Sequence, residues 1–134
     1  MIVADTNLIA YFLIAGPLSD AAQRVWDRDD TWLSPAVWQH ELLNVLATSV
    51  RNRLMSPDQA HQVWAHAPAF VREAEVAPME VLDLSVTAGF ATFDCYYVVL
   101  ARKLNARLVT ADNKLLGAFA DVAVSIRDFA EGNA

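Results

Sequence analysis

Glycine and cysteine are scarce in this chain, and their scarcity excludes several kinds of site. The four glycines, Gly16, Gly89, Gly117 and Gly132, are isolated from one another. The chain therefore lacks the glycine-rich loop that binds phosphate in NTPases and dinucleotide enzymes. The single cysteine, Cys95, excludes an internal disulfide and indicates that the protein works in a reducing cytoplasm.

Histidine clusters and long apolar runs are also missing. His40, His61 and His66 do not have the His-x-x-x-His spacing of a zinc site, so we expect them at the surface. No apolar run approaches the roughly 18 residues of a membrane span, and the N-terminus has no basic segment followed by an apolar stretch. We therefore expect neither a membrane helix nor a signal peptide. At 134 residues, the chain is expected to form one domain over residues 1–134.

Short apolar runs alternate with amphipathic segments along the chain. We expect strands at residues 2–4, 31–34, 75–77, 107–110 and 122–125. We expect helices at residues 6–14, 19–28, 35–53, 79–90, 94–105 and 113–119, and another that starts at Ser56 and is ended or kinked by Pro68. Strands that alternate with helices predict parallel βαβ units with helices on both faces of the sheet, which is an α/β fold.

Four acidic residues in separate segments are the candidates for a functional site. They are Asp5 in Ala-Asp-Thr-Asn, Glu41 in His-Glu-Leu-Leu-Asn, Asp94 in Phe-Asp-Cys-Tyr-Tyr, and Asp112 in Val-Thr-Ala-Asp. Asp5 and Asp112 directly follow expected strands, and the carboxyl ends of parallel strands meet at one edge of a sheet. Carboxylates held together repel one another unless a cation lies among them, and oxygen-only ligands suit Mg²⁺ or Mn²⁺. The pattern indicates a metal-dependent hydrolase of phosphodiesters.

The aspartates also have a simpler interpretation as helix caps. Aspartate is a favoured N-cap residue, and a cap contributes about 1 kcal/mol. Capping could account for Asp5, Asp94 and Asp112 taken singly. Glu41 is expected in the middle of a helix, where capping does not apply, on a stripe with Asn44 that borders an apolar face. This position favours a pocket lining.

The balance of charge is acidic, with 10 Lys and Arg residues against 16 Asp and Glu residues and a net charge of −6. Proteins that bind a phosphate backbone are usually basic. Removing the four candidate ligand carboxylates changes the net charge from −6 to −2, and two divalent cations would supply the same four positive charges. Bound metals, rather than a basic patch, would then attract the phosphate.

The order and contexts of the four segments resemble the PIN-domain family, and more closely its small bacterial VapC-type toxins of toxin–antitoxin pairs. The resemblance covers about residues 1–128 and rests on four motifs: Asp5-Thr6-Asn7 after a strand, Glu41-Leu42-Leu43-Asn44, Asp94 in Asp-x-x-Tyr-x-x-Leu-Ala, and Leu-Val-Thr-x-Asp112. Phe93 stands where a tyrosine is common in the family. Residues 57–78 match nothing distinctive, and selectivity for substrate or partner could reside there.

The resemblance implies a compact three-layer α/β/α sandwich around a small, mainly parallel sheet. It implies an endoribonuclease that acts on single-stranded or looped RNA, in which a cation lowers the pKa of the water that attacks the scissile phosphate. The implied Mg²⁺ or Mn²⁺ ligands are Asp5, Asp94, Glu41 and Asp112, the first two binding directly. The implied supporting residues are Thr6, Asn7, Asn44 and Thr110. The family also implies a homodimer and a cognate antitoxin, one segment of which lies in a groove beside the helix after Pro57.

Three alternatives stay open. A phosphatase that forms an aspartyl-phosphate also has an aspartate after its first strand, but its chemistry usually requires Asp-x-Asp, and this chain has Asp5-Thr6-Asn7. A stand-alone RNA-processing nuclease would share the site and lack an antitoxin. A non-catalytic binding module would use the acidic residues only as helix caps.

Overall fold

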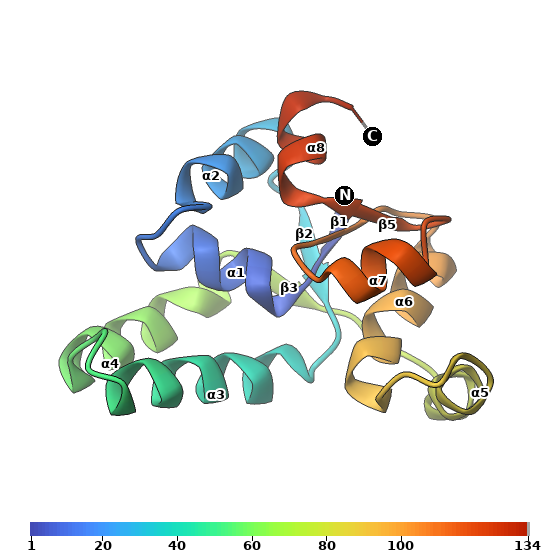
Figure 1. Ribbon diagram of the computed structural model, residues 1–134, viewed down its shortest axis with the longest axis horizontal. Helices are drawn as coiled ribbons and strands as arrows, with labels where there is room; N and C mark the ends of the chain where they lie inside the picture. The colour runs from blue at the N-terminus through green and yellow to red at the C-terminus, as the bar shows by residue number, and fades with distance from the viewer. Residues whose placement is uncertain (134) are drawn as a thin grey trace.

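A parallel β-sheet forms the centre of the computed structural model, which describes residues 1–133 (Figure 1). Its strand order is β3-β2-β1-β4-β5, and all four neighbouring pairs are parallel. The strands are β1 (Ile2–Ala4), β2 (Trp32–Ser34), β3 (Val71–Glu73), β4 (Leu108–Thr110) and β5 (Ala123–Ser125). Because β1 and β4 are neighbours, the residues that follow them lie at the same edge of the sheet.

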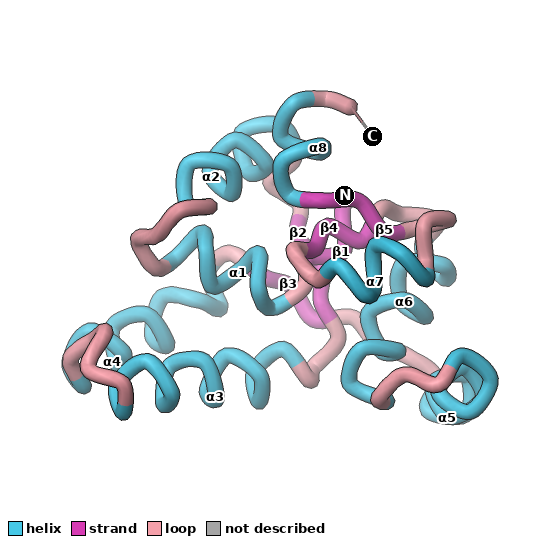
Figure 2. The backbone as a smooth tube through the Cα atoms, viewed as in Figure 1, coloured by secondary structure: helices cyan, strands magenta, loops and turns pink. Residues whose placement is uncertain are grey.

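Helices connect the strands and cover the sheet (Figure 2). They are α1 (Thr6–Leu13), α2 (Ser19–Arg28), α3 (Trp38–Arg51), α4 (Pro57–His66), the 3₁₀ helix η1 (Ala67–Ala69), α5 (Pro78–Ala88), α6 (Thr92–Leu104), α7 (Asn113–Ala118) and α8 (Ile126–Glu131). The short α/β connections fit the parallel topology, since a crossover between parallel strands needs room for a helix.

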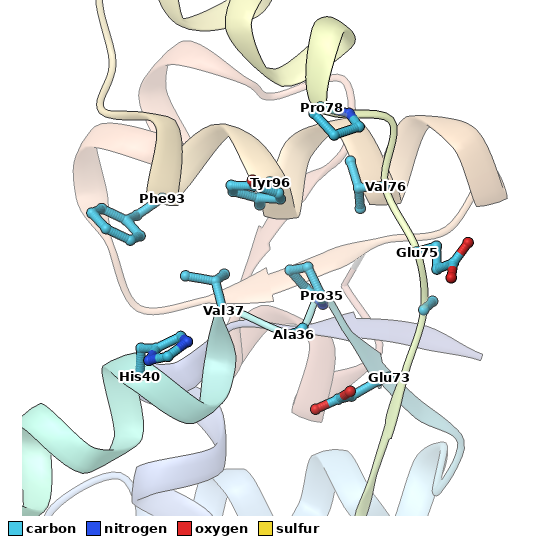
Figure 3. A pocket seen from close by; sticks show the side chains of 11 residues that line it. Pro35, Ala36, Val37, His40, Glu73, Glu75, Val76, Pro78, Phe93 and Tyr96 are labelled. Atoms are coloured by element: carbon cyan, nitrogen blue, oxygen red, sulfur yellow. The ribbon is translucent and has the colours of Figure 1, made fainter.

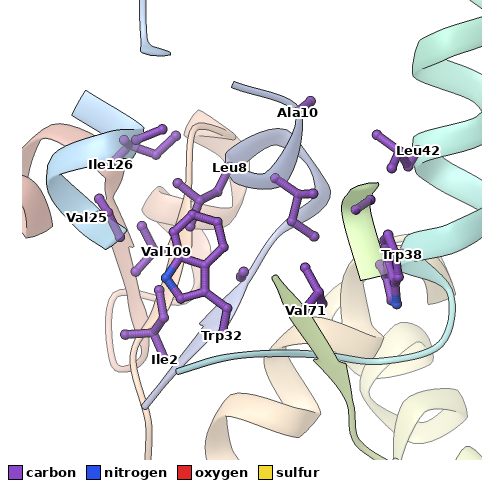
Figure 4. Packing of buried hydrophobic residues seen from close by; sticks show 14 of the residues in the cluster. Ile2, Leu8, Ala10, Val25, Trp32, Trp38, Leu42, Val71, Val109 and Ile126 are labelled. Carbon is purple, nitrogen blue, oxygen red and sulfur yellow. The ribbon is translucent and has the colours of Figure 1, made fainter. Parts of the chain in front are cut away.

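The two faces of the sheet bury alternate residues of β1. Ile2 and Ala4 belong to a core cluster that includes buried residues of α1, α2, α3 and α8, part of which appears in Figure 4. Val3 belongs to a second cluster with buried residues of α6 and α7, among them Tyr97 and Leu115. Helices therefore cover both faces, and the predicted three-layer α/β/α sandwich is confirmed.

The prediction of a strand at residues 75–77 was wrong, because the third strand lies four residues earlier at Val71–Glu73. Val71 pairs with Trp32 of β2 and is the one buried residue of this edge strand. Val76, the apolar residue that suggested the later position, packs instead against the α5–α6 side of the molecule. A three-residue edge strand carries no alternating pattern to read, so its position is decided by pairing with β2.

The expected start of the third helix also needs correction. α3 begins at Trp38, so Pro35 precedes the helix instead of occupying its first turn. Glu41 consequently lies in the first turn of α3 and not in its middle. Peptide dipoles make the N-terminus of a helix favourable for negative charge, so this position stabilises the Glu41 carboxylate.

Other helix boundaries follow local capping. As predicted, α4 follows Ser56, which forms a capping box with Gln59, and Pro68 lies in η1 beyond the helix end. Ser19 does not cap α2, since its hydroxyl donates to the Ile14 carbonyl at 2.9 Å. α8 was not predicted from the sequence, and Ser125 caps it by accepting a hydrogen bond from the Asp128 N–H at 3.0 Å.

The cysteine and the tryptophans contribute to the hydrophobic core. Cys95 is buried. Trp32 and Trp38 are buried, while Trp26 and Trp64 are partly buried against the first core cluster. The three histidines are exposed.

Within residues 1–133, no single helix is long and apolar enough to cross a membrane. The pair α5 and α6 reaches the required length and composition only together, and the chain bends by 114° between them.

Candidate active site

Asp5 and Asp112 lie where β1 and β4 end, at the carboxyl edge of the sheet. Both are N-caps: Asp5 accepts from the Thr6 N–H at 2.7 Å and Asp112 accepts from the Lys114 N–H at 2.8 Å. The capping interpretation of these two aspartates is therefore correct. It does not compete with a functional role, because neighbouring parallel strands bring both caps to one edge.

A hydrogen-bond network behind the edge holds Asp5 in place. The Thr110 hydroxyl donates to Asp5 Oδ2 at 2.7 Å, and the Asn7 amide donates to the same oxygen at 3.3 Å. Thr110 Oγ1 accepts from the Asp112 N–H at 3.0 Å, and Asn7 Oδ1 accepts from the Ala111 N–H at 3.0 Å. Asn7 and Thr110 thus link the segments that carry the two aspartates.

A second network holds Glu41 from α3. Tyr97 on α6 donates to Glu41 Oε1 at 2.5 Å, and the Thr6 hydroxyl is 2.6 Å from the Tyr97 hydroxyl and 3.3 Å from Glu41 Oε1. Burial, followed by the charges of Asp5 and Glu41, raises the pKa of Tyr97 far above its ordinary value. The phenol therefore stays protonated and remains a hydrogen-bond donor to the carboxylate.

Tyr97 was missed as a site residue in the sequence analysis, although a signal for it was present. It is the tyrosine of the Asp-x-x-Tyr motif, three residues after Asp94. Residues three apart lie on the same helix face, so the motif already predicted that the two side chains point to the same side of α6.

A pocket of about 500 Å³ brings the candidates together. Its lining consists of Asp5, Thr6, Asn7, His40, Glu41, Asn44, Val45, Phe93, Asp94 and Asp112. All four predicted carboxylates line it, as do the predicted supporting residues Thr6, Asn7 and Asn44. Thr110 is fully buried behind Asp5 and is the one predicted supporting residue outside the lining.

Asp94 occupies the first turn of α6, whose N-cap is Ala91. The capping interpretation of Asp94 was therefore wrong. Its carboxylate lies in the pocket, and burial and the charge of Asp112 raise its pKa, partly offset by Lys114.

Negative charge in the pocket is energetically unfavourable. Burial raises the pKa of Asp5 to about 7, opposed by the Thr110 hydrogen bond and reinforced by the charges of Glu41 and Asp94. Burial also raises the pKa of Glu41. Raised pKa values in a cluster of carboxylates mean that their ionised forms are disfavoured until positive charge is supplied. The site therefore favours a cation.

The residues that form this pocket all lie in a region of the chain that matches a known protein family. The family model described as PIN domain matches residues 2–124. The chain belongs to the PIN domain family. This PIN domain is 26% identical over 123 residues to Ribonuclease VapC3 of Pyrobaculum aerophilum, with 88% of this chain and 94% of that protein covered.

Two solved structures share the fold of this PIN domain. PAE2754 from Pyrobaculum aerophilum matches with a TM-score of 0.77 and 19% identity, covering 98% of this chain and 93% of the other. VapBC2 from Rickettsia felis, crystallised with a DNA fragment from the promoter, matches with a TM-score of 0.70 and 15% identity, covering 93% of this chain and 98% of the other. The likeness of fold extends over nearly the whole of each chain.

The donor atoms of this PIN domain fit a hard divalent cation. The pocket offers carboxylate and amide oxygens, which are the ligands of Mg²⁺ and Mn²⁺. Among residues 1–133, no group of three or more carboxylate, histidine or cysteine side chains is close enough together to hold a metal ion as the side chains stand.

Proposed function

We propose that the protein is a Mg²⁺- or Mn²⁺-dependent endoribonuclease and the toxin of a toxin–antitoxin pair. The observation that carries the proposal is that four carboxylates from four separate segments line one pocket. Membership of the PIN domain family and similarity to Ribonuclease VapC3 support the choice of RNA as substrate. The proposal places the protein in the cytoplasm, where RNA is present and a free cysteine stays reduced.

In this proposal Asp5 and Asp94 would hold the cation directly. Glu41 and Asp112 would bind it through water or orient the attacking water. The bound cation would supply positive charge that stabilises the phosphate and lowers the pKa of water.

Hydrogen bonds from neighbouring side chains position two of these carboxylates. Thr110 and Asn7 hold Asp5 Oδ2 by hydrogen bonds, so the carboxylate does not have to be reoriented when it binds a cation. Tyr97 and Thr6 both bond Glu41 through Oε1, and neither contact involves Oε2. Glu41 Oε2 is therefore available to accept a proton from a water beside the scissile phosphate, while Asn44 contributes an amide to the same wall.

The direct test is a cleavage assay with purified protein on single-stranded RNA, with p-nitrophenyl phosphate assayed in parallel. We expect RNA fragments in the presence of Mg²⁺, none in EDTA, and restored cleavage when excess Mg²⁺ is added back. Cleavage that persists in EDTA would contradict the metal dependence. Phosphate release without RNA cleavage would favour a phosphatase, and inactivity on both substrates would favour a non-catalytic binding module.

The antitoxin part of the proposal is supported by two hollows that flank α4. An apolar pocket of about 540 Å³ lies between α3 and α4, and a more polar pocket of about 360 Å³ lies where the end of α1 meets α4. The similar VapBC2 is a complex by its name. Hollows beside the helix after Pro57 can receive an amphipathic segment of a partner protein. Without such a partner, the same site would suit a stand-alone RNA-processing nuclease.

We also propose that the protein forms a homodimer. Large apolar side chains on α3 and α5 face solvent: Leu43 is 48% exposed, Leu82 is 47% exposed and Val86 is 77% exposed. Leu82 and Val86 are four residues apart on one face of α5, and exposed apolar surface of this kind marks interaction sites.

The expected result is a dimer mass by light scattering at tens of micromolar, and a shift towards monomer in Val86→Asp protein. Burying an unpaired carboxylate in an apolar interface is costly, which explains the direction. Leu54→Asp is the matched control, because Leu54 is 80% exposed and lies outside both helices. A monomer mass for the wild-type protein would refute this part of the proposal.

A further inference from the structure

The Tyr97 hydroxyl lies behind the carboxylate pocket, where side chains from three helices meet. Tyr97 on α6 donates to Glu41 on α3 at 2.5 Å, and the hydroxyl of Thr6 on α1 is 2.6 Å from the Tyr97 hydroxyl. Tyr97 is only 1% exposed, so RNA in the pocket cannot reach it. Tyr97 can therefore affect the reaction only through the side chains that it contacts.

The hydrogen bonds around Tyr97 fix the direction of the Glu41 carboxylate. A tyrosine hydroxyl has one hydrogen to donate, and Tyr97 donates it to Glu41 Oε1. The Thr6 hydroxyl lies within hydrogen-bond distance of the Tyr97 oxygen and, at 3.3 Å, of Glu41 Oε1. Both contacts of the carboxylate therefore end on Oε1. Because one oxygen is held, the other oxygen, Oε2, has a fixed direction and is left for the pocket that Glu41 lines.

The same contacts relate Glu41 to two other carboxylates of the pocket. The Thr6 N–H donates to Asp5 Oδ1 at 2.7 Å, while the Thr6 hydroxyl reaches Tyr97. Asp94 lies three residues before Tyr97 on α6, and residues three apart share one face of a helix. The Tyr97 hydroxyl thus joins the helices that position Asp5, Glu41 and Asp94.

The neighbouring tyrosine on α6 faces a different part of the molecule. Tyr96 lines a pocket of about 890 Å³ together with Phe93 (Figure 3). Successive residues of a helix are turned by about 100° from each other, so Tyr96 points away from the direction in which Tyr97 reaches Glu41. Replacing Tyr96 by phenylalanine removes the same chemical group from the same helix, and this variant is the matched control for Tyr97→Phe.

We propose that Tyr97 is a positioning residue of the nuclease, whose hydroxyl keeps Glu41 in the orientation that presents Oε2 to the pocket. The inference rests on the proposed nuclease function and adds to it a residue that touches neither RNA nor the cation. A catalytic group that is displaced from its working geometry loses rate. Loss of the Tyr97 hydroxyl should therefore slow the chemical step and leave RNA binding unchanged.

Steady-state cleavage of a labelled single-stranded RNA in Mg²⁺ separates these two effects. We expect Tyr97→Phe to lower kcat by about ten- to a hundred-fold and to leave KM within about two-fold of wild type, since the lost contact is with a carboxylate and not with substrate. Tyr96→Phe should cleave at the wild-type rate. A raised KM with unchanged kcat, or full activity in Tyr97→Phe protein, overturns the inference.

A double-mutant cycle with Glu41→Ala tests whether Tyr97 acts through Glu41. Glu41→Ala removes both the catalytic carboxylate and the acceptor of the Tyr97 hydrogen. In the Glu41→Ala background, Tyr97→Phe should change the residual cleavage rate by less than about two-fold, because the group that it positions is already gone. An equal loss of rate in both backgrounds shows that Tyr97 acts independently of Glu41, and the inference is then wrong.

Thermal unfolding in EDTA measures the same coupling without RNA or metal. We expect Tyr97→Phe to lower the Tm by about 5 °C when Glu41 is present, as the loss of a hydrogen bond to a charged group predicts for a chain of this size. The shift should be less than half as large when Glu41 is alanine. Equal shifts in both backgrounds overturn the inference. Absence of RNA cleavage by the wild-type protein contradicts the nuclease proposal, whereas this cycle still decides whether Tyr97 holds Glu41.

Thr6→Val provides a second variant in case Tyr97→Phe protein does not fold. Valine keeps the shape of threonine and the backbone N–H that donates to Asp5, but it removes the hydroxyl that contacts Tyr97. We expect kcat to fall less than in Tyr97→Phe, because Tyr97 keeps its own bond to Glu41, with KM unchanged. If Tyr97→Phe protein does not fold, an unchanged kcat in Thr6→Val protein overturns the inference.

Discussion

Protein carrying Asp94→Asn should lose RNA cleavage and keep its fold. The substitution preserves the size of the side chain but removes the negative charge that a cation requires. In the folded protein, burial and the charge of Asp112 raise the pKa of Asp94, so the ionised carboxylate is held at a cost. Removing it should leave the melting temperature of metal-free protein within a few degrees of wild type or raise it.

The matched control is Asp20→Asn. Asp20 lies in the first turn of α2, as Asp94 lies in the first turn of α6, so both substitutions remove the same favourable interaction with a helix dipole. Asp20 is exposed and outside the pocket, and its variant should cleave RNA at the wild-type rate. Cleavage is measured on labelled RNA in Mg²⁺, and stability by thermal unfolding in EDTA. Full activity in Asp94→Asn protein would eliminate the proposed site, and a large loss of stability would show that Asp94 is structural.

Expression of the wild-type chain alone in a bacterial host should arrest growth. An endoribonuclease without its inhibitor would degrade cellular RNA, whereas the same chain with Asp94→Asn would not. We expect colony counts to fall by orders of magnitude on induction of the wild-type gene and to stay at the uninduced level for the variant. Growth curves and plating after induction measure the effect.

Two further measurements make the growth experiment decisive. Immunoblots of cleared lysates must show equal amounts of the two proteins, and lysate from the wild-type culture must cleave added RNA. Normal growth in the presence of active wild-type protein would reject the toxin assignment and leave the nuclease assignment standing. Arrest by both proteins would show that toxicity does not depend on cleavage.

The sequence alone determined the class of fold and the four acidic positions. Short apolar runs between amphipathic segments predicted the parallel α/β sheet, because strand and helix periodicities are local properties of a chain. Asp5 and Asp112 could be assigned to one edge of the sheet, since both directly follow a strand. The start of α4 at Ser56 and its end before Pro68 were also predictable, because caps and proline act within a few residues.

Only the tertiary structure decided the features that depend on contacts between distant segments. The edge strand β3 is set by pairing of Val71 with Trp32, which no local pattern in a three-residue strand can specify. The bond from Tyr97 to Glu41 joins residues 56 positions apart, and the raised pKa of Asp5 comes first from burial beneath the surrounding elements. A pocket of about 890 Å³ is likewise lined by the turn after β2, the segment after β3 and the start of α6. The sequence shows which residues have side chains that can bind a cation. The distances between these side chains and their exposure to water depend on how the chain packs.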